Sequence, residues 1–240
     1  MIRYLASLLL SLALVCSQAS AGFLLNSFAL SGPPVLTFLQ CSTANPTGTN
    51  PYTWASQNVG TAGNRYTIVG VALEDSASVY TVSSVTVGGD AATLAVDEGG
   101  TQPASAAIFA LYNPAGTSED IVVTTSEAIT GGSICLWSVT DLSSVTATDT
   151  ATGNNSGGTT TMTLDVDLSA LGVGVGVCSE ANTSRTFTWT GFTEREDANG
   201  GSGARSAADY TATVAETNKA VTAARNGGSG NAGCVAATFR

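Results

Sequence analysis

Short apolar runs separated by turn-forming residues recur along most of the chain. Each run holds about five to ten residues and ends at Gly, Asn, Asp, Ser or Pro. Beyond the N-terminal region no segment keeps a helical periodicity for long. The pattern is typical of the many strands of a sandwich. The strands that it predicts are residues 33–41, 52–59, 64–74, 79–87, 91–96, 104–112, 121–125, 133–139, 162–168, 171–178, 186–190, 206–214, 219–224 and 233–239.

Local patterns refine this prediction. Residues 162–168 alternate apolar and polar side chains, which indicates one buried and one wet face. Residues 171–177 alternate Leu or Val with Gly, so something is expected to pack close to the backbone there. Gly-Gly-Asp at residues 88–90 predicts a tight hairpin, whereas residues 149–158 (DTATGNNSGG) are interpreted as a loop. The sum predicts an all-β fold: a single large antiparallel β-sandwich, jelly-roll or lectin-like, with an N-terminal hydrophobic leader.

Residues 1–21 are predicted to be a signal-peptide-like leader that directs Sec export. Arg3 supplies the positive charge, residues 5–15 form an apolar run, and residues 19–21 (ASA) offer a cleavage motif. The run is too short to span a bilayer. A retained segment docked in an assembly is the alternative interpretation. The remaining chain is divided into N-terminal strands with a connecting segment, residues 22–63, and a main sandwich body, residues 64–240.

Four cysteines remain once a leader containing Cys16 is removed. An even number in an exported chain indicates disulfides, although four cysteines allow three pairings and the spacing does not select one. Four buried thiols are the alternative. The candidate disulfide residues are Cys41, Cys135, Cys178 and Cys234.

Composition excludes several chemistries. The chain has no His, which rules out Ser-His-Asp catalysis and His-ligated zinc. Charged residues make up 11% and the net charge is −10, which argues against nucleic acid as a partner. We therefore expect no catalytic residue, no cofactor and no metal, and a protein that is not an enzyme.

Two acidic pairs are candidates for such chemistry. Glu194 and Glu196, which would lie on one side of any strand that contained them, are a carboxylate pair of the kind that glycosidases use. Asp165 and Asp167, on the exposed face of their strand, offer oxygen ligands that suit calcium. Neither pair has the spacing of a known motif. The favoured interpretation is a solvated loop at the end of a strand for the first pair, and strand solubility with turn formation for the second.

Aromatic residues are the candidate contacts for a glycan. Trp54, among Thr53, Ser56 and Gln57, is expected to be exposed, with Tyr52 beside it. Trp137, flanked by Leu136, is expected in the core.

Several segments together resemble a loosely defined family of β-sandwich proteins encoded by bacteriophages and alphaproteobacteria. The segments are NRYTIVGVA, SSVTVGG with AATL, SAAIFALYNPAGTSEDIVVT, CLWSVTDLSS and FTWTGFTE, which fall within residues 64–194. Residues 22–28 (GFLLNSF) look like a short opening of phage structural and tail-associated proteins. The resemblance implies a virion or surface location and transfers no catalytic residue.

The sequence thus favours a non-enzymatic extracellular structural or interaction protein, a phage virion surface component such as a decoration or tail-associated protein. A secreted bacterial carbohydrate-binding or adhesive module is the alternative. The expected partners are other virion or cell-surface proteins and glycans, or further copies of the chain in a homo-oligomer. The expected location is the virion surface or the extracellular space.

Overall fold

The computed structural model describes residues 32–44, 50–75, 78–100, 103–156, 160–182, 184–200, 203–227 and 230–240. Within these ranges the regular secondary structure consists of strands alone, and all the strand pairs are antiparallel. The predicted all-β sandwich is therefore confirmed. The predicted leader, Cys16 and residues 22–28 lie outside the described residues.

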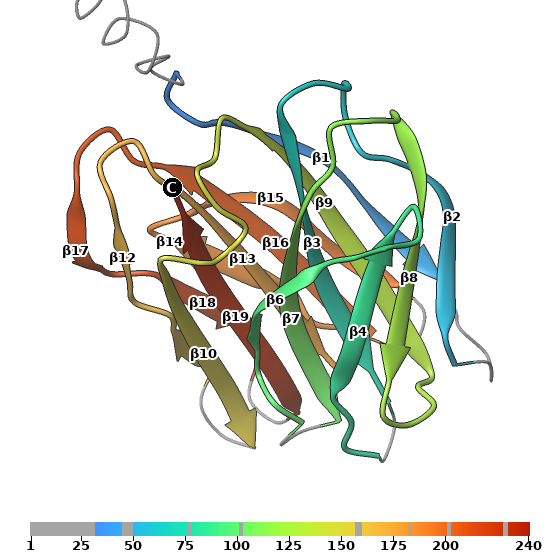
Figure 1. Cartoon of the computed structure of the whole chain (residues 1–240). Coiled ribbons are helices and arrows are strands. Elements are labelled where there is room, and N and C mark those ends of the chain that lie inside the picture. Colours follow the sequence, from blue (N-terminus) through green and yellow to red (C-terminus); the bar gives the residue numbers. More distant parts are fainter. Residues whose placement is uncertain are drawn as a thin grey trace, which may run out of the picture. The chain divides into compact units, whose positions relative to one another are not determined.

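The first half of the described chain forms two sheets (Figure 1). We call strands β1 to β9 repeat 1. Its inner sheet has the order β1 (Val35–Ala44), β9 (Gly131–Thr140), β3 (Arg65–Glu74), β7 (Ala104–Tyr112) and β6 (Thr93–Asp97). Its outer sheet has the order β2 (Tyr52–Asn58), β8 (Ser118–Thr125), β4 (Val82–Val87) and β5 (Asp90–Ala91).

The second half, repeat 2, is built in the same way. Its inner sheet has the order β10 (Asp149–Ser156), β19 (Asn231–Phe239), β13 (Val173–Glu180), β16 (Gly203–Thr211) and β15 (Thr193–Gly200). Its outer layer consists of two small sheets, β11 (Thr161–Thr163) with β18 (Thr222–Arg225) and β14 (Phe187–Thr190), and β12 (Val166–Leu168) with β17 (Glu216–Lys219).

The two repeats share one strand order. In the inner sheets the first strand pairs with the last, and the last pairs with the central strand, as β1-β9-β3 and β10-β19-β13 show. In the outer layers the strand after the first pairs with the strand before the last, as β2-β8 and β11-β18 show. Two sheets linked in this order are typical of a jelly roll. The sandwich expected from the sequence is thus assembled from two jelly-roll units in tandem.

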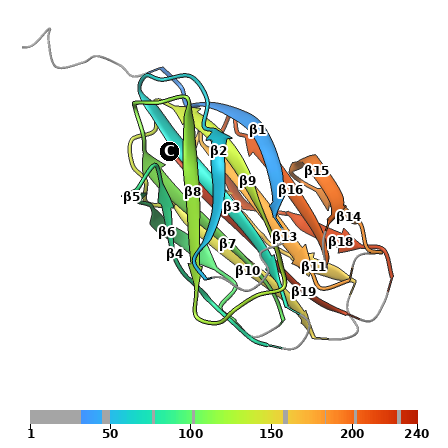
Figure 2. The same ribbon diagram turned by 90° about the vertical axis from the view of Figure 1, so that its right-hand side faces the viewer.

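The two inner sheets pack face to face, so the sheets form successive layers with an apolar core in each of the three gaps (Figure 2). The central core joins the repeats, for example Ile68 and Trp137 of repeat 1 with Val177 and Phe239 of repeat 2. Both faces of β3 and β13 are buried. A strand with two buried faces reads as a continuous apolar run, which explains why both were evident in the sequence.

Small residues allow the close approach of these layers. A Cβ at Gly70 of β3 would lie 2.3 Å from Val177 Cγ2 in the facing sheet. On the other face of β13, a Cβ at Gly174 or Gly176 would collide with the rings of Phe192 or Trp189. The close packing predicted for the glycine row is confirmed.

The four candidate cysteines form two disulfides, Cys41–Cys135 and Cys178–Cys234. Each disulfide joins residues that lie directly opposite each other on paired strands, β1 with β9 and β13 with β19. Each repeat therefore carries one covalent link within its own inner sheet. The alternative of four free thiols is wrong.

Residues 149–156 form strand β10 rather than the expected loop. A second strand that was not predicted is β15, Thr193–Gly200. Both strands are polar and lie at the two edges of the inner sheet of repeat 2, where one side of the backbone has no neighbouring strand. The hairpin predicted at residues 88–90 is confirmed, because Gly88 and Gly89 both have positive φ and connect β4 to β5.

Strands β1 and β2, from the predicted N-terminal segment 22–63, hydrogen-bond to β9 and β8 of the predicted body 64–240. They complete both sheets of repeat 1.

Candidate functional site

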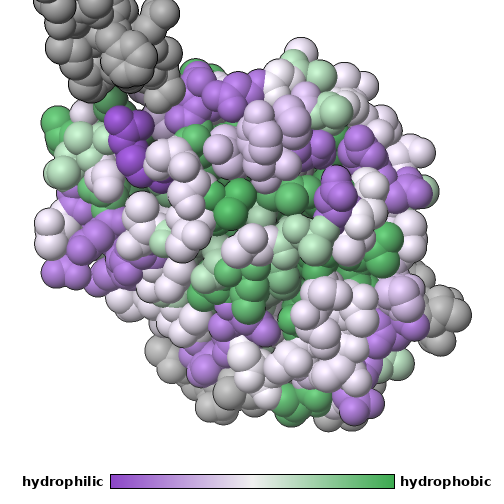
Figure 3. Space-filling view, viewed as in Figure 1, coloured by the Kyte–Doolittle hydropathy of each residue, from purple (hydrophilic) through white to green (hydrophobic). Residues whose placement is uncertain are grey.

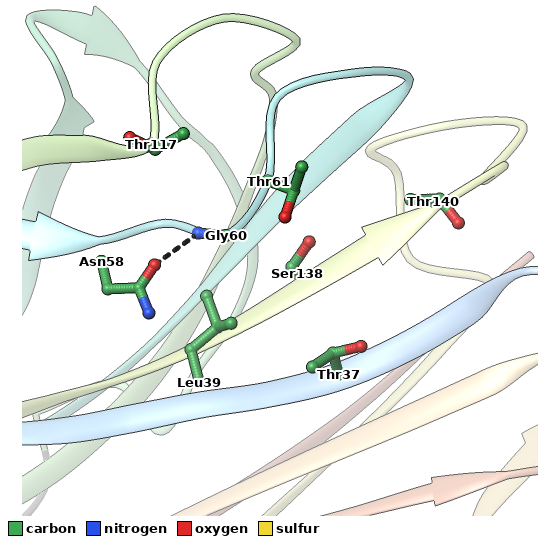
Figure 4. A pocket seen from close by; sticks show the side chains of 8 residues that line it. All are labelled: Thr37, Leu39, Asn58, Gly60, Thr61, Thr117, Ser138 and Thr140. Carbon is green, nitrogen blue, oxygen red and sulfur yellow. Dashed lines mark hydrogen bonds between the residues drawn. The ribbon is translucent and has the colours of Figure 1, made fainter.

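A hollow of about 450 Å³ opens at one end of repeat 1 (Figure 4). Six of its eight lining residues carry a hydroxyl or an amide, and none is ionisable. Strands β1 and β9 contribute its floor, and the segments that lead into β3 and β8 contribute its walls. The lining residues are Thr37, Leu39, Asn58, Gly60, Thr61, Thr117, Ser138 and Thr140. We call this hollow the hydroxyl groove.

The floor of the groove is a row of hydroxyls across three strands. Thr37 of β1 and Thr67 of β3 are both paired with Ser138 of β9, so the three side chains share one face of the sheet. Ser138 is 8% exposed and Thr67 is fully buried. Within the described residues, no group hydrogen-bonds to the Thr67 Oγ1. At the β3 end of the row, the Thr67 hydroxyl is therefore buried without a protein partner.

One wall of the groove is a tight loop that passes directly over Ser138. Gly60 has a φ of 91°, and a Cβ there would lie 2.9 Å from Ser138 Cβ. Only glycine fits both the positive φ and this approach. The Asn58 Oδ1 accepts a hydrogen bond of 2.9 Å from the Gly60 N–H. Figure 4 shows Thr61 and Ser138 pointing toward each other across the hollow.

A buried arginine holds this wall in place. Arg65 is 0% exposed, and its Nη1 donates to the carbonyl oxygens of Gly60 at 2.8 Å and Gly116 at 3.0 Å. Its Nη2 donates to the Ala115 carbonyl at 2.7 Å. Burial lowers the pKa of Arg65, and the nearby Glu119 acts in the opposite direction. One guanidinium therefore joins the loops on both sides of the groove through their backbones.

A second hollow, of about 520 Å³, lies beside the β4–β5 hairpin, and carboxylates contribute to its lining. Glu119 and Asp120 of β8 line it together with Gly88 and Gly89. The Asp120 Oδ1 accepts a hydrogen bond from the Ser56 N–H at 2.7 Å. These consecutive residues alternate along the strand, so their carboxylates leave the backbone in opposite directions.

The two aromatic residues predicted to contact a glycan are buried. Trp54 and Tyr52 are each 3% exposed and belong to the core between the sheets of repeat 1. The Tyr52 hydroxyl accepts a hydrogen bond from the Ile129 N–H at 2.8 Å. The expected exposure of Trp54 is wrong, because β2 alternates buried and exposed positions and places both rings inward. Trp137 lies in the core, as predicted.

The carboxylates of the two acidic pairs interact with backbone N–H groups or with arginine. A bulge in β15 pairs Glu194 with Ala208 and Glu196 with Ala207, so the two carboxylates lie on opposite faces rather than on one side. Glu196 forms a salt bridge of 3.0 Å with Arg205, and Glu194 accepts from the Trp189 N–H at 3.4 Å.

Asp165 and Asp167 are exposed, as predicted. Their carboxylates accept hydrogen bonds from the N–H groups of Val221 and Asn218, at 3.0 and 2.6 Å. Among the described residues, no group of three or more acidic, Cys or His side chains could hold a metal ion.

Apolar residues lie together over β6 on the face that Figure 3 shows. Among them, Leu94 of β6 is 49% exposed. No helix in the described part of the chain is long and apolar enough to cross a membrane.

The hydroxyl groove was not predicted from the sequence. Its residues come from four separate stretches, and each Thr or Ser alone is an ordinary polar residue of a strand or loop. The one local signal was the alternation of Thr37 with apolar neighbours in β1, which placed its side chain opposite to Phe38.

No family model and no curated protein matches the chain. Among solved structures, the chain is similar at 13% identity to a chain of red clover necrotic mosaic virus, covering 87% of this chain and 96% of that chain. The TM-score is 0.23. A similarity this low identifies neither a shared fold nor a shared function.

Proposed function

We propose that this chain is a non-enzymatic structural and interaction protein of a phage particle's surface. The observation that carries the proposal is the tandem jelly roll with one disulfide in each repeat. Jelly rolls are common in viral capsid and lectin domains. Disulfides persist in oxidising surroundings such as virion surfaces. The fold provides a rigid body that presents its loops and outer sheets to partners.

The lining of the hydroxyl groove and the contacts of the two candidate acidic pairs support a role without chemistry. The hydroxyl groove has no titratable lining residue. The carboxylates of Glu194, Glu196, Asp165 and Asp167 are engaged by backbone N–H groups or by arginine. General acid–base catalysis needs a positioned proton donor or acceptor in reach of a substrate. The alternative of a glycan-binding module is not proposed on Trp54 and Tyr52, because both are buried.

The experiment is to separate phage particles on a density gradient and to quantify peptides of this chain by mass spectrometry in every fraction. The proposal predicts a constant ratio of the chain to the major particle protein across the particle peak. An abundant soluble host protein serves as the control and should not follow that peak. Absence of the chain from the peak would contradict the proposal.

A further inference from the structure

We infer that the hydroxyl groove binds a neutral polyhydroxyl ligand, a sugar residue of a glycan. The inference goes beyond the proposed particle location and does not depend on it. It starts from the composition of the groove, where hydroxyls and one amide surround an uncharged hollow. A hydroxyl both donates and accepts hydrogen bonds, as does a carboxamide, and a sugar ring presents the same groups. An uncharged lining offers no counter-ion to a charged ligand.

The polar groups of the groove are available to a ligand. Within the described residues, Thr67 Oγ1 beside the groove is buried without a hydrogen-bond partner, and the side chains of Thr37 and Thr61 are exposed. Unpaired polar groups in a partly buried site favour a ligand that can satisfy them. Leu39 adds one apolar wall for the C–H face of a sugar ring.

The dimensions of the groove suit one sugar residue that remains part of a chain. Its volume of about 450 Å³ falls within the range of small-molecule sites. Thr37, Asn58, Thr61 and Thr117 are exposed, so the groove opens to solvent and a longer glycan can extend out of it. No aromatic ring lines the groove, so we expect a weak affinity.

The groove is preformed. Arg65 binds the carbonyls of Gly60, Ala115 and Gly116, and the Cys41–Cys135 disulfide links the two strands that form the floor. A ligand therefore binds without ordering a loop, which removes one cost of association. Arg65 does not line the groove, so its role is to position the wall.

The test uses saturation-transfer NMR on the full chain with the methyl glycosides of glucose, galactose, mannose and N-acetylglucosamine, and with glucuronic and sialic acids as the charged probes. The groove variant combines Thr37→Val, Thr61→Val and Ser138→Ala, which removes three hydroxyls. The matched control combines Thr150→Val, Thr152→Val and Thr188→Val, which removes three exposed hydroxyls of repeat 2. The dispersion of amide resonances confirms that both variants fold.

The inference predicts that at least one neutral glycoside binds, that the groove variant weakens this binding at least about tenfold, and that the control leaves it unchanged. No binding to the unaltered protein, equal binding by the groove variant, equal loss in the control, or preference for the charged sugars would each overturn it. Whether the chain is found in particles affects none of these outcomes, so the proposed function and this inference fail separately.

Discussion

The buried carboxylate of Asp209, in repeat 2, accepts a hydrogen bond of 3.0 Å from the indole Nε1 of Trp137, in repeat 1. Its other oxygen accepts from Arg195 Nε at 2.9 Å. Trp137 is fully buried and Asp209 is 2% exposed. A polar bond inside the central core thus fixes the register of the two inner sheets relative to each other.

Asp209→Ala should destabilise the whole protein. It leaves the buried indole N–H without its acceptor and removes a hydrogen bond to a charged group, which together cost about 3 kcal/mol in the free energy of unfolding. Urea unfolding followed by tryptophan fluorescence measures the loss. Asp209→Asn is the matched variant, because it keeps an acceptor for the indole and should lose clearly less. Equal losses in the two variants would show that the bond to Trp137 contributes little.

Removal of either disulfide should also lower stability. The linked residues are 94 positions apart in repeat 1 and 56 in repeat 2. Loop-closure entropy for such lengths gives about 4 to 5 kcal/mol for each link. Cys41→Ala with Cys135→Ala, and Cys178→Ala with Cys234→Ala, test the two links separately by urea unfolding.

Reducing agent provides the control for the disulfide variants. It should destabilise the unaltered protein more than either double variant, since each variant has one link left to lose. If reduction left the unfolding midpoint of the unaltered protein unchanged, the assigned role of the links would be wrong.

The sequence predicted the strands whose apolar runs are continuous or alternate cleanly, such as β3, β13 and β19. It missed β10 and β15, because an edge strand of Thr, Asn, Gly and charged residues has the composition of a loop. The bulge in β15 also breaks the alternation that would have placed Glu194 and Glu196 on one side of the strand.

The shared strand order of the two repeats and the groove could not be predicted for a different reason. The repeats share strand order but not residue pattern: β13 alternates Val with Gly, whereas β3 has Val and Leu on one face and Ile, Gly and Ala on the other. Strand order is a property of pairing, which one sequence does not display. The exposure of Trp54 was misjudged from its polar neighbours, although the alternation within β2 already placed it with Tyr52.

Gly70→Ala should lower stability through contact between the repeats. Its new methyl group would lie 2.3 Å from Val177 Cγ2, and overpacking of this kind costs about 1 to 3 kcal/mol. Val177→Ala removes the obstructing atom at its own cost in lost packing. The double variant should lose less than the sum of the two single variants in urea unfolding. Additive losses would mean that the two residues do not touch.

Lys219, the single lysine of the chain, should react slowly with amine-reactive reagents. Its Nζ lies 2.9 Å from Glu216 Oε2 and 3.7 Å from the centre of the Tyr210 ring. Burial lowers the pKa of Lys219, but hydrogen bonds with Glu216 and Tyr210 outweigh it and raise the pKa. Since only the unprotonated amine reacts, a raised pKa reduces the reactive fraction at mildly alkaline pH.

Mass spectrometry after timed labelling measures the rate at Lys219, and the exposed amine introduced by Thr150→Lys provides the reference. Lys219 should react several-fold more slowly than this reference, and Glu216→Gln should raise its rate. Equal rates at the two amines would contradict the assigned contacts.

The same contacts predict a pH dependence of stability. The hydrogen bonds from Lys219 and Tyr210 lower the pKa of Glu216. Its contribution is therefore present above the ordinary pKa of a glutamate and is lost as pH falls through the lowered value. The contribution of Lys219 is present below the ordinary pKa of a lysine and is lost as pH rises through its raised value. Because both groups are partly exposed, the pair contributes less than about 1 kcal/mol, which a urea series across pH with Glu216→Gln as reference measures.

Calorimetric unfolding of the full chain tests most directly whether the two jelly rolls form one body, on which the rigid surface role depends. A shared central core predicts a single transition whose calorimetric and van't Hoff enthalpies agree. It also predicts that Asp209→Ala shifts that transition as a whole. Two resolved transitions, of which Asp209→Ala moves only one, would contradict the account.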